Sequence, residues 1–349
     1  MNTKTSRREF IKASTLTAGA MFTGCLSATP ANPQPAFIWS ALVHLGFGMW
    51  GDNNISPNLR FDEEFWKDLS ERLRAAGANQ IILDLGEGLV YPSHPELAVN
   101  GSWSPEKMRG EIERLRRMGF EVIPKVNFSS AHDAWLRDYS RMLSTPAYYK
   151  ACREIIGDVA EIFDHPRFIH LGYDEETAEF QTKERGYPMV IIRQGELWWH
   201  DYNWFVEVTK AAGSRPWIWC DYMRRHPDEF WQKMSKDSLM SPWDYSGPLD
   251  PAKNKKTKIY IDLDKAGYDQ VICSSNCYEI KEKHSDIFLK TVKFCEANLS
   301  KAHLKGYMHA PWCRTVPDFK NGDGSLCKER WAGAVANIAA AVKFVEGRG

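Results

Sequence analysis

The chain has 349 residues, 43% of them hydrophobic, which is enough for one large core or two smaller ones. Lys plus Arg and Asp plus Glu both number 45, so the formal net charge is zero. This balance gives no indication of a nucleic-acid surface or of an anionic membrane partner. The aromatic content is 13%, with 14 Trp, and composition alone does not say whether these rings fill a core or line a site.

The first residues are expected to be a targeting signal rather than part of the folded domain. The stretch "SRREFIK" at 6–12 carries paired arginines, and a small-residue apolar run at 13–24 follows it. This pattern resembles a twin-arginine export signal, and the run is too short to span a bilayer as a helix. We therefore expect residues 1–24 to be a signal peptide and the protein to be exported, to the periplasm or the cell surface. The alternative is an ordinary basic amphipathic N-terminus.

Cys25 ends the sequence "FTGC", where a lipoprotein signal would place its lipidated cysteine, so a lipid anchor is an open expectation. Residues 25–35 read as a Pro-rich linker. The chain holds eight cysteines, several within apolar runs, and these are expected to pack as free, small hydrophobic side chains. Cys273 and Cys277 are four residues apart without a second pair at metal-ligand spacing, so no zinc site is expected.

From residue 36 onward, short apolar runs alternate with longer helical patterns. The predicted strands are 37–50, 79–88, 120–128, 167–173, 215–222, 238–245, 269–278 and 304–312. The predicted helices are 62–77, 104–119, 146–163, 196–213, 285–298 and 328–347, the first two with Asp62 and Ser104 as N-caps. This order predicts one α/β domain over 36–349, a (β/α)8 TIM barrel whose strands are buried on both faces. The alternative, a doubly wound open sheet, lacks a Gly-rich phosphate turn after the first strand.

In such barrels the chemistry lies at the carboxyl ends of the strands. Most of the residues at these ends are aromatic or acidic: Trp50 and Asp52, Glu87, Asn127 and His132, Asp174 and Glu175, Trp219 and Asp221, Trp243 and Asp244, Tyr278, and Trp312 and Arg314. Rings stack on sugar faces, and carboxylates bind hydroxyls or move protons. The pattern therefore predicts a carbohydrate site.

The fourth strand leads into "FIHLGYDEET" at 168–177, with three adjacent acids. Alternation along a strand would put His170, Gly172 and Asp174 on one face, which we expect to point into the barrel. Glu175 can share that pocket only if the strand ends near Tyr173 and the chain turns.

The next residue, Glu176, is expected to begin the following helix, where a carboxylate suits the helix dipole. A solvated helix cap is the alternative interpretation of the whole acidic run at 174–176.

Within this stretch, "HLGYDEE" is similar to the His-x-Gly-x-Asp-Glu signature of glycoside hydrolase family 20, the β-N-acetylhexosaminidases. Other residues resemble the family in the same order along the chain: His132 at the end of the strand-three motif, Trp219, Trp243 and Trp312 as wall tryptophans, and Tyr278 as the strand-seven tyrosine. Three positions depart from the family: the first strand has no arginine, Asn127 stands where an aspartate is more common, and the acid that commonly follows the strand-seven tyrosine is missing after Tyr278.

The resemblance implies an N-acetylhexosamine-containing glycan as substrate, no cofactor and no metal. It implies retaining, substrate-assisted catalysis, with Glu175 as general acid and base and Asp174 orienting the 2-acetamido group. Tyr278 would donate a hydrogen bond to the acetamido oxygen, and the tryptophans would enclose its methyl group. Substrate contacts are also expected from His132, His170, Asp221, Asn127 and Glu87, although the histidines and tryptophans have a second interpretation as core or rim packing.

Two other functions remain open at the level of sequence. One is a sugar-binding barrel without turnover. The other is a glycosidase of different specificity, in which Glu175 pairs with a carboxylate from another strand, namely Asp221, Asp244 or Glu87.

Overall fold

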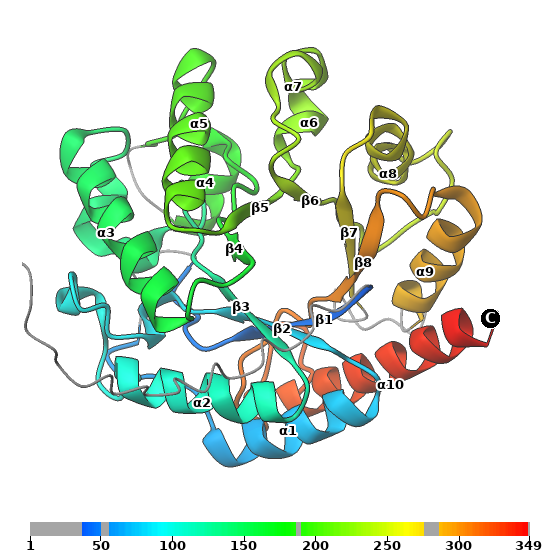
Figure 1. Cartoon of the computed structure of the whole chain (residues 1–349), viewed down its shortest axis with the longest axis horizontal. Coiled ribbons are helices and arrows are strands. Elements are labelled where there is room, and N and C mark those ends of the chain that lie inside the picture. Colours follow the sequence, from blue (N-terminus) through cyan, green and yellow to red (C-terminus); the bar gives the residue numbers. More distant parts are fainter. Residues whose placement is uncertain (1–36, 50–55, 186–189, 276–285, 348–349) are drawn as a thin grey trace, which may run out of the picture. The chain divides into compact units, whose positions relative to one another are not determined.

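A computed structural model describes residues 37–49, 56–185, 190–275 and 286–347 of the chain. Within residues 34–349, which form one compact unit, eight strands close into a parallel barrel in the order β1 to β8 (Figure 1). The predicted single-domain (β/α)8 barrel is therefore confirmed, and an open sheet is excluded. The predicted signal and linker at 1–35, with Cys25, lie outside the described residues, as do Trp50, Asp52, Cys277 and Tyr278.

The strands are shorter than the apolar runs that predicted them. They are β1 (Ile38–His44), β2 (Gln80–Asp84), β3 (Glu121–Lys125), β4 (Phe168–His170), β5 (Arg215–Trp219), β6 (Leu239–Ser241), β7 (Gln270–Ser274) and β8 (Leu304–His309). The apolar character continues beyond each strand because the loops at the barrel mouth are themselves buried, as Leu45, Val126 and Leu171 show. Hydrophobic patterning thus located the strands correctly and overestimated their length.

The helices surround the barrel, and in Figure 1 α1, α2 and α10 run alongside one another outside β1 and β2. They are α1 (Glu63–Ala75), α2 (Pro105–Arg117), α3 (Pro146–Ile162), α4 (Ala178–Arg185), α5 (Glu196–Ala211), α6 (Tyr222–Arg225), α7 (Pro227–Lys233), α8 (Lys255–Ala266), α9 (Ile287–Asn298) and α10 (Cys327–Glu346), with 3-10 turns η2 (Gly86–Gly88), η3 (Pro95–Leu97) and η4 (Ala134–Arg141). Asp62 and Ser104 accept N-cap hydrogen bonds from the amides of Phe65 and Lys107, as predicted.

Three helices between β5 and β7 were not predicted. Tyr222, placed in the fifth strand by its apolar neighbours, instead begins α6. The helix α8 begins at the cap Asn254, whose side chain accepts a hydrogen bond from the amide of Lys256. Lys256 thereby reaches the barrel mouth, where its Nζ lies 3.8 Å from the ring centre of Trp243.

The barrel interior contains a charged cluster beneath the mouth. His44, Asp84, Lys125 and His170 occupy paired positions on β1 to β4. Lys125 Nζ lies 2.6 Å from Asp84 Oδ2, and His44 Nδ1 lies 3.2 Å from the same oxygen. All of these side chains are buried, so the pair of opposite charges must compensate for their desolvation.

The described cysteines, Cys152, Cys220, Cys273, Cys295, Cys313 and Cys327, are all buried and form no disulfide. For Cys220 and Cys273, which lie in predicted apolar runs, the expected packing as small hydrophobic side chains is confirmed, because both belong to the buried core. In the same part of the chain, no helix combines the length and the apolar character needed to cross a membrane.

Candidate active site

The loop between β4 and α4 carries the acidic run, and its backbone reverses direction immediately after the strand. The strand ends at His170, and Gly172, Tyr173 and Glu175 have φ angles of 79°, 71° and 54°. The predicted alternation as far as Asp174 is therefore wrong, because left-handed residues break the two-residue period of a strand. This turn is what brings Asp174 and Glu175 to one place.

His132 lies against both carboxylates. Its Nε2 is 3.3 Å from Asp174 Oδ2 and 3.2 Å from Glu175 Oε2. The side chain of Asp174 is 10% exposed and that of Glu175 is 30% exposed, so Glu175 faces the solvent and Asp174 lies behind it. Burial of the His132 ring opposes its protonation, but the two carboxylates outweigh burial and raise its pKa. The three groups can hold and exchange protons.

The residues after β3 fix Asp174. Asn127 donates from Nδ2 to Asp174 Oδ1 at 3.1 Å and accepts from the Ser129 amide at 3.0 Å. The Ser129 hydroxyl donates to the backbone carbonyl of Asp174. Asn127 is thus a neutral donor to the carboxylate, and an aspartate at this position could not donate in its charged form. Sequence analysis did not identify Ser129, since a serine in a loop has no distinctive pattern.

The third acid, Glu176, does not begin a helix at the surface. Its side chain is 4% exposed, and Oε1 forms an ion pair with Arg193 Nη1 at 3.0 Å and accepts from the Ser130 amide at 2.7 Å. Helix α4 begins two residues later, at Ala178. The prediction that Glu176 stabilises the start of the next helix is therefore wrong. Its carboxylate forms an ion pair with an arginine that is distant in the sequence. Arg193 itself stands in a segment without periodicity, and no local signal marked it.

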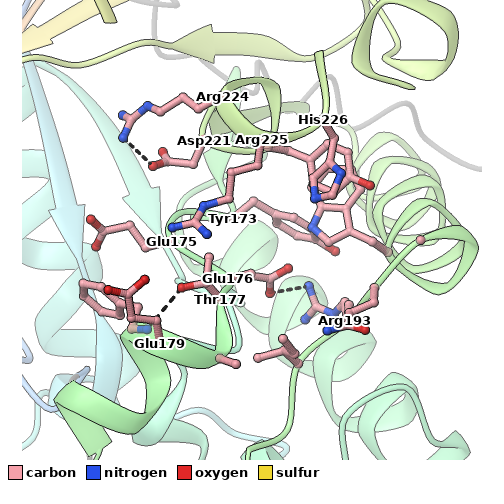
Figure 2. Close-up of a pocket in the computed structure, with 17 residues that line it drawn as sticks. Tyr173, Glu175, Glu176, Thr177, Glu179, Arg193, Asp221, Arg224, Arg225 and His226 are labelled. Atoms are coloured by element: carbon pink, nitrogen blue, oxygen red, sulfur yellow. Dashed lines mark hydrogen bonds and ion pairs between the residues drawn. The ribbon is translucent and has the colours of Figure 1, made fainter. Parts of the chain in front are cut away.

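A pocket of about 840 Å³ opens beside Glu175 (Figure 2). Its walls come from the β4–α4 loop, from the segment leading into α5 and from α6 with its flanking residues. Figure 2 shows Glu175, from the β4–α4 loop, and Asp221 and Arg225, from the start and end of the α6 segment, directed into this space. An acid at the rim of a pocket of this volume can transfer a proton to a ligand held there.

Of the three predicted wall tryptophans, Trp219 is part of the inner core of the barrel, and Trp243 and Trp312 pack against that core. Trp219 is 1% exposed and lies 6.1 Å from Trp312, measured between ring centres. Trp243 stacks on Tyr245 at 4.9 Å, and the Arg224 guanidinium lies 3.9 Å from the Trp243 ring centre. Tyr245 was missed as a member of this aromatic group because it was read only as the end of a strand.

The other predicted carboxylates already have partners. Asp221 accepts from Trp243 Nε1 at 2.8 Å and pairs with Arg224 at 3.2 Å; burial raises its pKa, although Arg224 opposes this. Asp244 accepts from Asn254 at 2.6 Å. Glu87 accepts from the amides of Phe47 and Gly48, both at 3.0 Å, and therefore anchors the loop after β1.

His170 lies below the mouth and is completely buried between rings. Its centre is 5.4 Å from that of Trp217 and 4.8 Å from that of Trp219, and its Nδ1 accepts from the Gly172 amide at 3.1 Å. Burial lowers its pKa well below the ordinary value, so the ring is neutral. This environment is that of a structural histidine that supports the turn.

One group of described residues has the spacing of metal ligands. Ligand atoms of His132, Asp174 and Glu175 all lie within 4.8 Å of one another. Imidazole and carboxylate together suit several divalent ions, including Zn²⁺. These are the same residues that the sequence analysis assigned to proton transfer and substrate orientation, so a metal here would compete with those roles.

Together, the fold and the loop define a (β/α)8 barrel with a histidine and two carboxylates clustered where β4 ends. Neither protein-family models nor curated protein sequences provide a match for this chain. Solved structures do match. The GH20 exo β-N-acetylglucosaminidase from Vibrio harveyi, in complex with N-acetylglucosamine, is 13% identical, with a TM-score of 0.59 over 90% of this chain and 57% of that chain.

Two further structures give the same result. The β-N-acetylhexosaminidase from Bacteroides fragilis is 12% identical, with a TM-score of 0.59 over 88% of this chain and 66% of that chain. Dispersin B is 11% identical, with a TM-score of 0.56 over 87% of this chain and 98% of that chain. The chain spans little more than half of the Vibrio harveyi enzyme. The predicted resemblance to glycoside hydrolase family 20 is thus confirmed at the level of the fold.

Proposed function

We propose that the protein is a glycoside hydrolase that releases N-acetylhexosamine from glycans, with Glu175 as general acid and base. The observation that carries this proposal is the contact of His132 with both Asp174 and Glu175 at the end of β4. In a barrel of this kind, that position faces bound substrate. The similarity to solved hexosaminidases supports the same reaction class.

In this mechanism, Glu175 gives its proton to the glycosidic oxygen as the bond to the anomeric carbon breaks. The oxygen of the substrate's 2-acetamido group attacks that carbon and forms an oxazolinium ion. Glu175 then removes a proton from water, which opens the ring and gives the product with retained configuration. Asp174, buried and fixed by Asn127, would accept the acetamido N–H and stabilise its positive charge. We assign Tyr278 and the three tryptophans to the acetamido group on the resemblance alone.

The partners of the other carboxylates support this assignment over a pairing of Glu175 with an acid from another strand. Glu87 and Asp244 are held by backbone amides and by Asn254, respectively. Asp221 lines the pocket with Glu175, which makes it the strongest competitor for a second catalytic role. The variant Asp221→Asn is therefore assayed beside Glu175→Gln in the experiment below, and a loss of activity as large as that of Glu175→Gln would assign the second catalytic role to Asp221.

The test is hydrolysis of aryl β-N-acetylglucosaminide, β-N-acetylgalactosaminide, β-glucoside and β-galactoside by the purified chain and by Glu175→Gln. Glu161→Gln, an exposed glutamate on α3, is the matched control. We expect release from the acetamido sugars only, a loss of at least about 100-fold in Glu175→Gln, and no loss in the control. Equal release from sugars without an acetamido group would contradict substrate assistance. Sugar binding without any turnover would favour the binding barrel.

We also propose that residues 1–24 direct export through the twin-arginine route, with Cys25 as a candidate lipid attachment site. The support is the sequence pattern of Arg7, Arg8 and the apolar run. Replacement of both arginines by lysine is expected to keep the full-length precursor in the cytoplasm, whereas Cys25→Ser should remove only a lipid label. Unchanged fractionation of the double lysine variant would refute this route.

A further inference from the structure

Arg193 is a buried cation that contacts four separate parts of the chain. Its side chain is fully buried and forms ion pairs with Glu176 Oε1 and Asp201 Oδ2, both at 3.0 Å. It donates from Nη2 to the Phe128 carbonyl at 2.7 Å and to the Tyr148 hydroxyl at 2.9 Å. The β3–η4 loop, α3, the β4–α4 loop and α5 thus meet at one guanidinium.

Two contacts of Arg193, one of them with the ring of Tyr173, enclose the acidic pair. The Arg193 guanidinium lies 4.9 Å from the ring centre of Tyr173, directly before Asp174, and pairs with Glu176, directly after Glu175. Both Tyr173 and Glu175 have positive φ angles, a conformation that side-chain-bearing residues avoid. Such a backbone persists only when surrounding contacts enforce it. Figure 2 shows Arg193 and Glu176 directed toward each other in the pocket wall, with a dashed line for their ion pair.

The same pair also links the acids to their histidine. Glu176 accepts the amide of Ser130, and the hydroxyl of Ser129 donates to the carbonyl of Asp174. Ser129 and Ser130 belong to the loop that carries His132 two residues later. A displacement of Glu176 would therefore change the distance between His132 and the carboxylates as well as the direction of Glu175.

We propose that Arg193 and Glu176 form a positioning pair that holds the loop at 171–177 so that Asp174 and Glu175 meet His132. In this role the pair acts through the backbone of its neighbours. The three adjacent acids then differ in what they do: Asp174 and Glu175 contact His132, and Glu176 is the anchor that orients them. The kinetic part of the inference rests on the proposed function, and the structural part does not.

The test compares Glu176→Gln with Glu121→Gln. Glu121 pairs with Arg167 at 2.6 Å, with side chains 12% and 28% exposed, at the opposite end of the barrel. Both substitutions remove one carboxylate charge from an arginine pair, and glutamine retains an acceptor for the Ser130 amide. We expect both variants to lower the melting temperature. Only Glu176→Gln should lower kcat, by about 10- to 100-fold, with little change in KM. Arg193→Lys, which retains the charge but not the fork, is the second variant and should behave like Glu176→Gln.

A readout independent of turnover is the geometry of the site in crystal structures of the variants. His132 Nε2 lies 3.3 Å from Asp174 Oδ2 and 3.2 Å from Glu175 Oε2. In Glu176→Gln and Arg193→Lys we expect the loop at 171–177 to move and these contacts to be lost, whereas in Glu121→Gln they should stay. Unchanged distances in both variants, or a kcat loss equal to that of Glu121→Gln, would overturn the inference. An inactive wild type whose variants show the expected displacement would refute the proposed function alone.

Discussion

Gly172 and Asn127 approach so closely that a Cβ atom on Gly172 would lie 1.8 Å from Asn127 Oδ1. The glycine also has a φ of 79°, so two independent constraints exclude a side chain here. Asn127 in turn holds Asp174. Position 172 therefore has to be glycine, because any side chain there would displace Asn127, which fixes the buried Asp174.

This relationship predicts that Gly172→Ala is strongly destabilising. The positive φ costs about 1–2 kcal/mol for an alanine, and the overlap with Asn127 adds about 1–3 kcal/mol. Gly101→Ala is the matched control, because Gly101 has a φ of 84° but its nearest atom, Leu59 Cβ, would be 3.7 Å away. Urea unfolding of the two variants measures the difference. Equal losses would show that the contact with Asn127 is not restrictive.

The buried Asp84–Lys125 pair predicts a large effect of Asp84→Asn. Removing the carboxylate leaves the Lys125 ammonium without its ion-pair partner in the barrel interior, which costs about 3–5 kcal/mol. The double variant Asp84→Asn with Lys125→Met should recover part of this loss. Asp68→Asn, which breaks an exposed pair with Arg72, should change the free energy of unfolding little. A loss in Asp84→Asn no larger than in Asp68→Asn would contradict the structure.

The Asp84–Lys125 pair also predicts how the free energy of unfolding depends on pH. Burial alone would raise the pKa of Asp84, but Lys125 and His44 lower it from 3.8 to about 2. A lowered pKa means that the stabilisation is complete above the unfolded value of 3.8 and is lost as the pH falls toward 2. Unfolding measured between pH 5 and 2 should show the wild type losing its advantage over Asp84→Asn. A constant difference across this range would refute the assignment.

His132 predicts a dependence of the opposite sign. Its pKa is raised above 6.5 because Asp174 and Glu175 outweigh burial. The stabilisation from the charged ring is therefore complete below pH 6.5 and disappears as the pH rises through the raised value. The melting temperature of the wild type relative to His132→Gln should fall over that window. His200, which is exposed on α5, provides the control substitution His200→Gln.

The spacing of His132, Asp174 and Glu175 predicts how metals affect the enzyme. The proposed reaction uses no metal, so activity should survive EDTA. Added Zn²⁺ should inhibit, because it would bind the carboxylates that must accept the substrate and transfer the proton. His132→Gln should weaken this inhibition in assays of residual activity. Loss of activity in EDTA with recovery by Zn²⁺ would instead assign a catalytic metal.

Local sequence patterns were sufficient to predict the barrel and the position of its acidic loop. Strands that are buried on both faces appear in the sequence as runs of apolar residues. Helix caps such as Asp62 and Ser104 act within a single turn, so they too can be predicted from neighbouring residues. The signature at 168–177 located Asp174 and Glu175. Local patterns also hid the short helices after β5, because Tyr222 follows an apolar run and α6 spans only Tyr222–Arg225.

The role of each acid depends on contacts that exist only in the folded protein. Alternation along a strand did not predict the position of Asp174 correctly, since the chain turns at Gly172, against Asn127 from the loop after β3. Glu176 became an anchor because Arg193, 17 residues later in the sequence, packs behind it. These roles depend on contacts between distant segments and on burial, which no short stretch of sequence contains. Patterning fixes which elements form, and the packing of loops from different strands fixes the chemistry at their ends.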